Sequence, residues 1–580
     1  MKLTPQQREA VSQPGHMYID ACPGSGKTRV LTAKAIRECT RVEGSPRKIA
    51  CMTFTNAAAD EVQTRLASRL THEQLSSVTV CTIHSFCLNE IFRPFRERLD
   101  AYAQGFEIVL NDEVRARQLL ADIAQSEGFN KPDARMYEAF AGVNIDAKGN
   151  PIASGRQPLL EKCMPIYWDM CRQRGWIDFS LLLYESLMIL INHPELKASL
   201  AAKFKTILVD EFQDTSEIQL EILREIRETA TSEFFLVGDP HQSIYRFAGA
   251  CPESSQQFVV EIGADCSHPL SGNFRSSDEI IAMAEKLLPR HPAMQAVGEN
   301  AKTGVSAQVF SSPSMSRAIT EHFLPMVSSA GIAYGACAVL AAWWTDLLPV
   351  ARACSQAGIS VIGPGARPYR RGRLIVPLLE NLAAAATSYI SLAATQRALT
   401  RTVNEIGGGD AERFDGWLGR LFTLTLQQHA QQLLRDTANA IDWILALGAT
   451  IDALLLAREI DTRGAFEVSA KEIHADLHAR HTKGEIDMTR LSVGDLGLFA
   501  NPQNAIKLLT VHAAKGREFE AVAVIGMNEG RFPHFSASTA EAIEDGRRSA
   551  YVAMTRAKRL LNVYVDTSDR RNGPSRFISS

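Results

Sequence analysis

A glycine-rich segment near the start of the chain has the composition of a phosphate-binding loop. Gly24 and Gly26 would let backbone N–H groups approach phosphate oxygens. Lys27 would reach the outer phosphates, and the hydroxyl of Thr28 would bind Mg²⁺. The segment consists of Ala21, Cys22, Pro23, Gly24, Ser25, Gly26, Lys27 and Thr28. It predicts a nucleotide-binding site, and the alternative is a glycine-rich turn that binds nothing.

Two adjacent carboxylates follow an apolar run later in the chain. Residues 204–209 are mostly apolar and lead into Asp210 and Glu211. Asp210 would hold the Mg²⁺ shell, and Glu211 would orient and deprotonate the attacking water. A further apolar run, residues 233–237, leads to Gln242, which is placed to sense the γ-phosphate. A lone acidic pair is commonly a solvated turn, but a phosphate-binding loop upstream favours catalysis here.

The elements that must position these groups are three short strands and one helix. Residues 17–21 are a strand candidate before the glycine-rich segment, and residues 29–39 are a helix candidate after it. The apolar runs before Asp210 and before Gln242 are two more strand candidates. Apolar strands that each end in polar loop residues are typical of a parallel sheet with a nucleotide across its edge. The sequence therefore predicts an α/β fold around the site.

Composition sets the broad class of the protein. A chain of 580 residues is too long for one core, and the prior is about four domains. Hydrophobic residues make up 46%, charged residues 22%, and the formal charge is −3, so any surface for nucleic acid must be local. The eleven cysteines are scattered without a C-x-x-C pair, which argues against a disulfide framework or a metal cluster. We expect most of them to be buried in a reducing compartment.

One uncharged stretch requires a test for membrane insertion. Residues 323–345 carry no charge, but prolines, serines and glycines interrupt them, and only residues 336–342 are continuously apolar. A buried strand entered through a loop explains that pattern better than a membrane span. The N-terminus lacks the apolar stretch of a signal peptide. We therefore expect a cytoplasmic protein with no membrane partner.

Further motifs extend the pattern across nearly the whole chain. With the segments above, the runs are residues 3–11, 21–28, 53–56, 82–86, 210–215, 238–246, 273–276, 510–519, 551–557 and 574–577. In these motifs and in their order, the chain resembles superfamily 1 DNA helicases of the UvrD/Rep/PcrA type. The resemblance implies an ATP-dependent motor that uses Mg²⁺ and binds single-stranded DNA and single-strand/double-strand DNA junctions. It implies movement in the 3′-to-5′ direction.

The resemblance also assigns nucleotide roles to residues outside the glycine-rich segment. It implies that Gln7 reads adenine and that Phe274 stacks on it. Arg275 and Arg556 would be the arginines that contact the γ-phosphate, and Glu518 belongs to a motif that contacts nucleotide and DNA backbone. ATP would then lie between two sheets, with both arginines supplied by the second motor domain.

A third set of residues is implied to contact DNA. It comprises Phe54, Thr55, Asn56, His84, Tyr245, Phe247 and His512. The chain departs from the family's pattern here, since Phe247 stands where tryptophan is usual and Ala57 where lysine is common. Phenylalanine can still stack on a base, so the departure at Phe247 affects stepping more than binding. The departure at Ala57 would cost one contact with the DNA backbone. In the phosphate loop, Ala21 replaces the first glycine of the general pattern.

The resemblance implies two RecA-like P-loop motor domains with parallel sheets, each carrying a mainly helical insertion. The first motor domain is expected at residues 1–87 and 176–266, with its insertion at residues 88–175. The second motor domain is expected at residues 267–392 and 493–580, with its insertion at residues 393–492. The second insertion is short for the family. Within it, the apolar residues from 417 to 434 lie at spacings that suit one helix face. Pro364 with Gly365, and the glycines at 407–409, mark expected turns.

Three functions remain open at this point. The favoured one is a translocase and helicase in DNA repair, recombination or replication restart. The second is a DNA-sensing ATPase subunit that regulates a protein partner, such as a nuclease in a phage-defence or recombination complex, or a repair factor. The third, a relic that only binds, is disfavoured because Lys27, Glu211 and both arginines are present.

Overall fold

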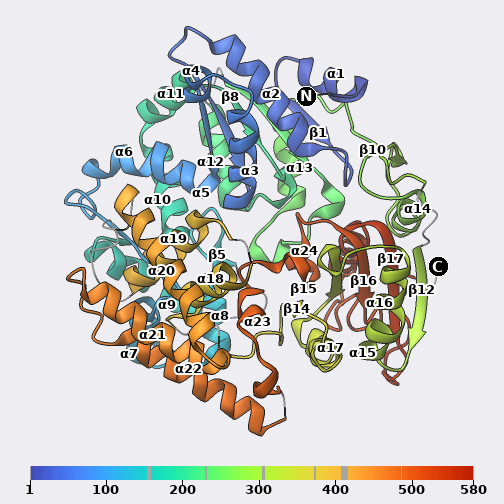
Figure 1. Cartoon of the computed structure of the whole chain (residues 1–580). Coiled ribbons are helices and arrows are strands. Elements are labelled where there is room, and N and C mark those ends of the chain that lie inside the picture. Colours follow the sequence, from blue (N-terminus) through green and yellow to red (C-terminus); the bar gives the residue numbers. More distant parts are fainter. Residues whose placement is uncertain are drawn as a thin grey trace. The chain divides into compact units, whose positions relative to one another are not determined.

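The computed structural model divides the chain into two compact units, Met1–Lys302 and Thr303–Ser580. Each unit is built around its own parallel sheet (Figure 1). The structure describes residues 2–152, 158–228, 232–302, 307–370, 374–388, 390–405, 414, 416–484 and 486–578. The turn expected at the glycines 407–409 lies outside the described residues.

The first unit contains a five-stranded parallel sheet in the order β1-β9-β8-β2-β3. The strands are β1 (Met17–Asp20), β9 (Glu233–Gly238), β8 (Phe204–Val209), β2 (Lys48–Thr53) and β3 (Val78–Thr82). Their apolar residues are almost all buried because helices cover both faces, as parallel sheets require. The three strand candidates around the glycine-rich segment, Asp210 and Gln242 are confirmed as β1, β8 and β9.

The helices of the first insertion share a core with this sheet. They are α7 (Val114–Ser126), α8 (Ala134–Ala141) and α9 (Pro158–Gln173). Their buried residues belong to one hydrophobic cluster that also includes Ile207 of β8 and Leu236 of β9. The insertion and the sheet therefore belong to one continuous hydrophobic core.

The second unit contains a six-stranded parallel sheet in the order β12-β17-β16-β13-β15-β14. The strands are β12 (Ala307–Ser312), β17 (Ala557–Asp566), β16 (Phe519–Ile525), β13 (Cys337–Ala341), β15 (Ile506–Thr510) and β14 (Val361–Ile362). Every residue of β13 is buried, which confirms that the apolar run 336–342 is a core strand. No helix within the described residues has both the length and the apolar character to span a bilayer.

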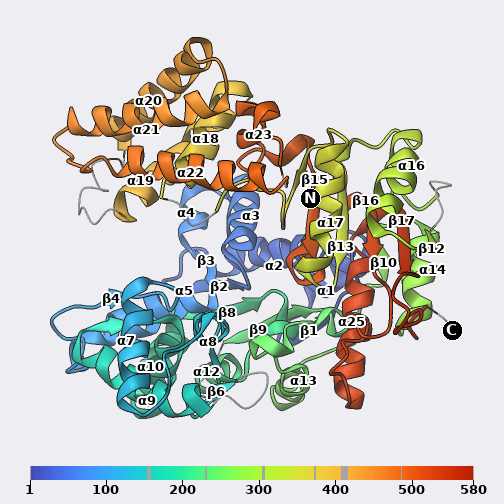
Figure 2. The same cartoon turned by 90° about the horizontal axis from the view of Figure 1, so that it is seen from below.

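A separate helical group follows in the second unit (Figure 2). It is built from α18 (Val376–Thr387), α19 (Leu392–Glu405), α20 (Gly416–Asp436), α21 (Ala440–Leu456) and α22 (Ala465–Thr482). α20 is helical as expected, but Phe422 and Leu426 face the core whereas Trp417 and Leu421 are exposed. The apolar residues from 417 to 434 therefore do not share one buried face.

The expected boundary at residue 267 falls inside the first compact unit, and the one at residue 392 falls inside the helical group. Residues 267–302 lie in the first unit, because Cys22 N donates to Leu270 O (3.0 Å) and Phe274 N donates to Gly24 O (2.9 Å). α18 packs with the helical group rather than ending the sheet segment at residue 392. The division into six segments stays a prediction.

Candidate functional site

The glycine-rich segment connects β1 to α2 (Lys27–Val42), which is the strand–loop–helix order that a phosphate-binding loop needs. Gly24 and Gly26 have φ values of +69° and +84°, a region that favours glycine. A Cβ added at Gly24 would lie 2.6 Å from Arg275 Cβ and 2.7 Å from Asn273 Oδ1. The hydroxyl of Ser25 donates to Cys22 O at 2.7 Å and closes the loop on itself. The glycines thus leave the backbone of the loop free of side chains, and the hydrogen bond of Ser25 stabilises the loop conformation.

Arg275 and Phe274 lie beside this loop, in the first unit. They follow β10 (Gly272–Asn273), and Asn273 Oδ1 accepts hydrogen bonds from the backbone N–H of Arg275 (2.7 Å) and Ser276 (2.9 Å). Backbone hydrogen bonds join residues 265–274 to β1 and to the loop. The expected supply of Arg275 by the second motor domain stays a prediction. The Nδ2 atom of Asn273 is buried and has no hydrogen-bond partner among the described residues.

Gln7 is held against the same loop. It is buried in α1 (Pro5–Ser12), where it forms a capping box with Thr4. Its Nε2 donates to Ser25 O at 2.8 Å, and a Cβ added at Gly26 would lie 3.1 Å from that nitrogen. The structure therefore brings Gln7 to the phosphate-binding loop, and its adenine-reading role stays a prediction.

The two carboxylates lie at the carboxyl end of β8. Asp210 is buried, and Glu211 has a left-handed φ of +49°, which is rare outside glycine and typical of functional sites. Burial and the adjacent Glu211 raise the pKa of Asp210 to about 7, although Lys27 opposes the shift. Glu211 Oε2 is 3.9 Å from Lys27 Nζ. A divalent ion bound beside Asp210 and Glu211 would offset the negative charge of the two carboxylates.

The residues present fit Mg²⁺ and a nucleoside triphosphate. Thr28 is the second residue of α2, so its hydroxyl lies at the helix end that favours phosphate. No group of three or more His, Cys, Asp or Glu side chains is gathered for a metal within the described part of the chain. The carboxylate of Asp210 and the hydroxyl of Thr28 are oxygen ligands of the kind that Mg²⁺ binds together with phosphate oxygens.

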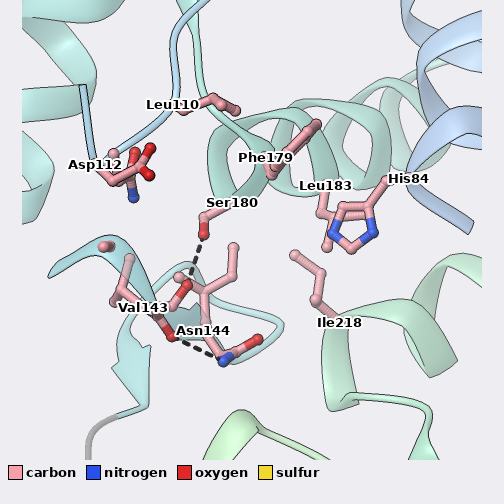
Figure 3. A pocket seen from close by; sticks show the side chains of 13 residues that line it. His84, Leu110, Asp112, Val143, Asn144, Phe179, Ser180, Leu183 and Ile218 are labelled. Atoms are coloured by element: carbon pink, nitrogen blue, oxygen red, sulfur yellow. Dashed lines mark hydrogen bonds between the residues drawn. The ribbon is translucent and has the colours of Figure 1, made fainter. Parts of the chain in front are cut away.

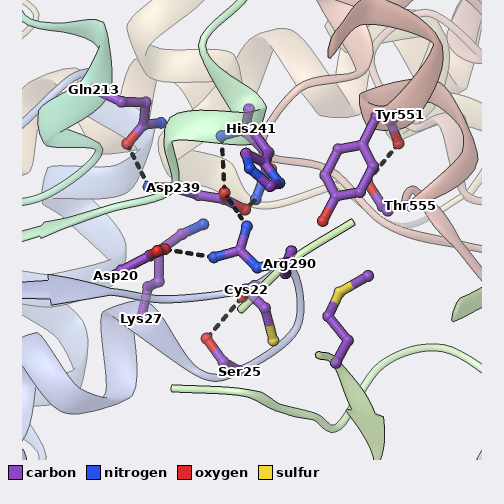
Figure 4. A network of polar contacts seen from close by, with 12 residues as sticks. Asp20, Cys22, Ser25, Lys27, Gln213, Asp239, His241, Arg290, Tyr551 and Thr555 are labelled. Atoms are coloured by element: carbon purple, nitrogen blue, oxygen red, sulfur yellow. Dashed lines mark hydrogen bonds and ion pairs between the residues drawn. The ribbon is translucent and has the colours of Figure 1, made fainter. Parts of the chain in front are cut away.

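A polar network links Glu211 to Gln242, and Figure 4 shows the part of it formed by Gln213 and Asp239. Gln213 donates to Glu211 Oε2 at 2.6 Å and accepts from the backbone N–H of Asp239 at 2.9 Å. Asp239 in turn accepts from Gln242 Nε2 at 2.6 Å. Gln242 and the two acids therefore belong to one hydrogen-bonded system at the ends of β8 and β9.

Arg290 completes this network and was not anticipated from the sequence. Its guanidinium lies between Asp20, at the end of β1, and Asp239, whose Oδ1 is 2.5 Å from Nη1 (Figure 4). Burial alone would raise the pKa of Asp239, but Arg290 and Lys27 lower it to about 2. Arg290 and Asp239 are 51 positions apart in the chain, so the sequence carries no local signal of this pairing.

Three of the residues predicted to contact DNA lie together in the first unit. The rings of Phe54 and Tyr245 stack with centroids 5.3 Å apart and planes at 18°, and Phe247 lies 6.1 Å from Tyr245. Phe54 and Phe247 are 42% and 57% exposed. Exposed aromatic faces at strand ends are suitable platforms for bases.

Other predicted DNA residues of the first unit lie at neighbouring strand ends. Thr55 caps α3 (Asn56–Ala67) by accepting from Ala58 N at 3.2 Å, and Asn56 is the first residue of that helix. His84 contacts Phe179 edge-to-face, with centroids 5.5 Å apart. Burial lowers the pKa of His84, so its ring is neutral at neutral pH.

His84 and Phe179 line a cavity of about 400 Å³ (Figure 3). Ser180 and Asn144 face the same cavity, so sheet and insertion both contribute to its wall. The hydroxyl of Ser180 donates to Val143 O at 2.9 Å. Phe179 was not predicted as a site residue, although it belongs to the expected return to the motor domain at residues 176–179.

The predicted residues of the second unit lie at strand ends of its own sheet. His512 is in α24 (Val511–Ala514), directly after β15. Glu518 Oε1 is 3.1 Å from Lys558 Nζ. Arg556 is buried, and its guanidinium donates to the carbonyl oxygens of Val552 (3.0 Å) and Arg517 (3.3 Å). Its role toward the γ-phosphate stays a prediction.

Two family models match the chain. The model of the UvrD/REP helicase N-terminal domain matches residues 3–261, and that of the UvrD-like helicase C-terminal domain matches residues 484–567. DNA helicase II of Salmonella typhimurium is 28% identical, over 99% of this chain and 87% of that protein. The ATP-dependent DNA helicase Rep of the same species is 25% identical, over 100% and 94%. The ATP-dependent DNA helicase PcrA of Staphylococcus epidermidis is 25% identical, over 99% and 86%.

Proposed function

We propose a direction of movement and a cellular role for this chain, which belongs to the UvrD/REP helicase family and is an ATP-dependent DNA helicase. We propose that it moves 3′ to 5′ along single-stranded DNA, using ATP and Mg²⁺. We propose further that it acts in DNA repair, recombination or replication restart. The observation that carries the motor function is the network that joins Lys27, Glu211 and Gln242 in one unit with exposed, stacked aromatic rings.

The nucleotide chemistry follows from the groups around the phosphate-binding loop. Lys27 and the loop N–H groups would bind the phosphates, and Glu211 would orient and deprotonate water. Thr28 and Asp210 would hold Mg²⁺, which supplies positive charge that offsets charge developing on the transferred phosphoryl group. Arg275, next to Gly24, is the arginine that we place on the γ-phosphate.

Coupling to DNA would run through the loop after β9. Gln242 is hydrogen-bonded to Asp239, and the same loop continues to Tyr245 and Phe247. A change in the contacts of Gln242 on hydrolysis would therefore be transmitted over three to five residues to the rings that hold bases. This short path is a physical reason for DNA-stimulated hydrolysis.

The test is ATP hydrolysis with and without single-stranded DNA, for the wild type and for Glu211→Gln. We expect strong stimulation by DNA and a loss of hydrolysis of at least about 100-fold in Glu211→Gln, because the general base is removed. The matched control is Glu195→Gln, an exposed glutamate of the same unit, which should hydrolyse ATP as the wild type does. Negligible hydrolysis by the wild type in both conditions would contradict an autonomous motor.

A further inference from the structure

Two asparagine side chains hold the main chain of Arg275. Oδ1 of Asn273 accepts hydrogen bonds from the backbone N–H of Arg275 (2.7 Å) and of Ser276 (2.9 Å). On the other side, Nδ2 of Asn300 donates to the carbonyl oxygen of Arg275 at 2.9 Å. Because both peptide groups next to its Cα are hydrogen-bonded, the direction in which the Arg275 side chain leaves the backbone depends on these two residues.

The side chain of Asn273 also packs against the phosphate-binding loop. A Cβ added at Gly24 would lie 2.7 Å from Asn273 Oδ1, which is closer than real Cβ atoms approach, and 3.1 Å from Asn273 Cγ. The backbone N–H of Phe274 donates to Gly24 O at 2.9 Å. The oxygen that accepts from Arg275 therefore lies directly beside the loop. A shift of the backbone at Gly24 would displace the acceptor that positions Arg275.

An asparagine at position 273 fits a neighbouring anion. Aspartate would accept the same two hydrogen bonds, but it would place a negative charge beside a loop that binds phosphate groups. Asparagine supplies the acceptor without the charge. Its side chain is 0% exposed, and Nδ2 has no hydrogen-bond partner in the part of the chain that the structure describes. A buried donor without a partner destabilises the folded state, so stability alone does not explain this residue.

We propose that Asn273 is a positioning residue for Arg275, which it couples to the phosphate-binding loop through Gly24. The inference rests on the proposed function, in which Arg275 contacts the γ-phosphate. Asn273 itself is assigned no contact with the nucleotide. Its effect on binding therefore depends on whether the ligand carries a γ-phosphate, which ATP has and ADP lacks. Asn273 thus contributes to the preference of the site for a triphosphate over a diphosphate.

The experiment compares the affinity of the full chain for ADP and for the non-hydrolysable imido analogue of ATP, by calorimetry with Mg²⁺. In Asn273→Ala, we expect the affinity for the analogue to fall about tenfold, because Arg275 is no longer oriented toward the γ-phosphate. The affinity for ADP should stay within about twofold of the wild type. DNA-stimulated kcat for ATP should fall about 10- to 100-fold, since only part of the contribution of the arginine is lost.

A second variant, Asn273→Asp, separates the hydrogen bonds from the charge. It keeps the acceptor for Arg275 and Ser276, so the ratio of the two affinities should stay near the wild-type value. Both affinities should fall together, because a carboxylate beside the loop repels the phosphates of either nucleotide. This variant also serves if Asn273→Ala does not fold. A ratio as low as that of Arg275→Ala would overturn the proposal.

Three further variants show whether Asn273 acts through Arg275. Arg275→Ala should lose affinity for the analogue, and the double variant Asn273→Ala/Arg275→Ala should lose no more than Arg275→Ala does. The matched control is Asn192→Ala, which removes an exposed asparagine of the same unit and should behave as the wild type does.

The outcomes separate the inference from the proposed function. Additive losses in the double variant, or equal losses of ADP and analogue affinity in Asn273→Ala, would overturn the proposal, because the asparagine would then support the loop itself. Wild-type affinities and kcat in Asn273→Ala, alongside a loss in Arg275→Ala, would overturn it and leave the proposed function standing. Wild-type hydrolysis by Arg275→Ala would remove the proposed role of Arg275 and, with it, the inference.

Discussion

The carboxyl group of Asp210 is the predicted Mg²⁺ ligand, and its ionised form lowers the free energy of unfolding. Its pKa in the folded protein is about 7, above the value near 4 of an unfolded chain. The folded state therefore binds this proton more tightly, and stability falls as pH rises from about 4 to about 7. We expect Asp210→Asn to raise the free energy of unfolding by roughly 1–4 kcal/mol at pH 8 and by little at pH 4. Calorimetry without nucleotide or Mg²⁺ measures the difference.

The same variant should lose ATP hydrolysis, because an amide is a poorer ligand for Mg²⁺ than a carboxylate. Asp178 offers a matched control, since burial raises its pKa to about 6 and it caps α10 (Phe179–Asn192). Asp178→Asn should show the same pH trend over a narrower window and keep hydrolysis. A destabilised Asp210→Asn protein at pH 8 would show that the ionised carboxylate is not strained in the folded state.

At the scale of elements, Arg290 ties the end of β1 to the loop after β9, where Gln242 lies. Removing its charge in Arg290→Met would leave Asp239 buried without its main cation, and burial would then raise the pKa of Asp239. We expect kcat for ATP to fall about tenfold with little change in KM, and the loss to deepen at lower pH. Steady-state kinetics between pH 6 and 9 test both features.

Two further variants distinguish positioning from simple unfolding. Arg290→Lys keeps the charge but cannot span both acids, so it should recover part of kcat. Asp20→Asn leaves the Arg290–Asp239 pair intact and should cost less than Arg290→Met. Equal losses of kcat in all three variants, with matching falls in thermal stability, would show that Arg290 contributes only to folding.

Local elements could be predicted from the sequence, and distant pairings could not. β8 begins and ends at the predicted residues, because an apolar run with a polar end is a complete local signal. The hydrogen bonds that join residues 265–274 to β1 could not be predicted, since motif order does not reveal which sheet a connecting segment packs on. The exposed face of α20 was not predicted. Its buried face includes Gly419, Thr423 and Ala430, which are too small or too polar to stand out in a hydrophobic pattern.

At the scale of the whole molecule, each unit has its own sheet and its own buried clusters. Lys27, Asp210, Glu211 and Arg275 all lie in the first unit. The residues predicted to contact DNA occur in both units, with His512 in the second. Hydrolysis in one unit can therefore move DNA only if both units bind the strand, and binding must alternate between them in a fixed order.

Such alternation gives movement in a single direction, because a DNA strand has chemical polarity and each step repeats the same contacts. We predict that the protein displaces streptavidin from biotin at the 5′ end of an oligonucleotide, and not from the 3′ end. It should also open a duplex that has a 3′ single-stranded tail in preference to one with a 5′ tail. Glu211→Gln should do neither, since hydrolysis drives each step. Faster displacement from the 3′ end would reverse the proposed direction while leaving the motor function intact.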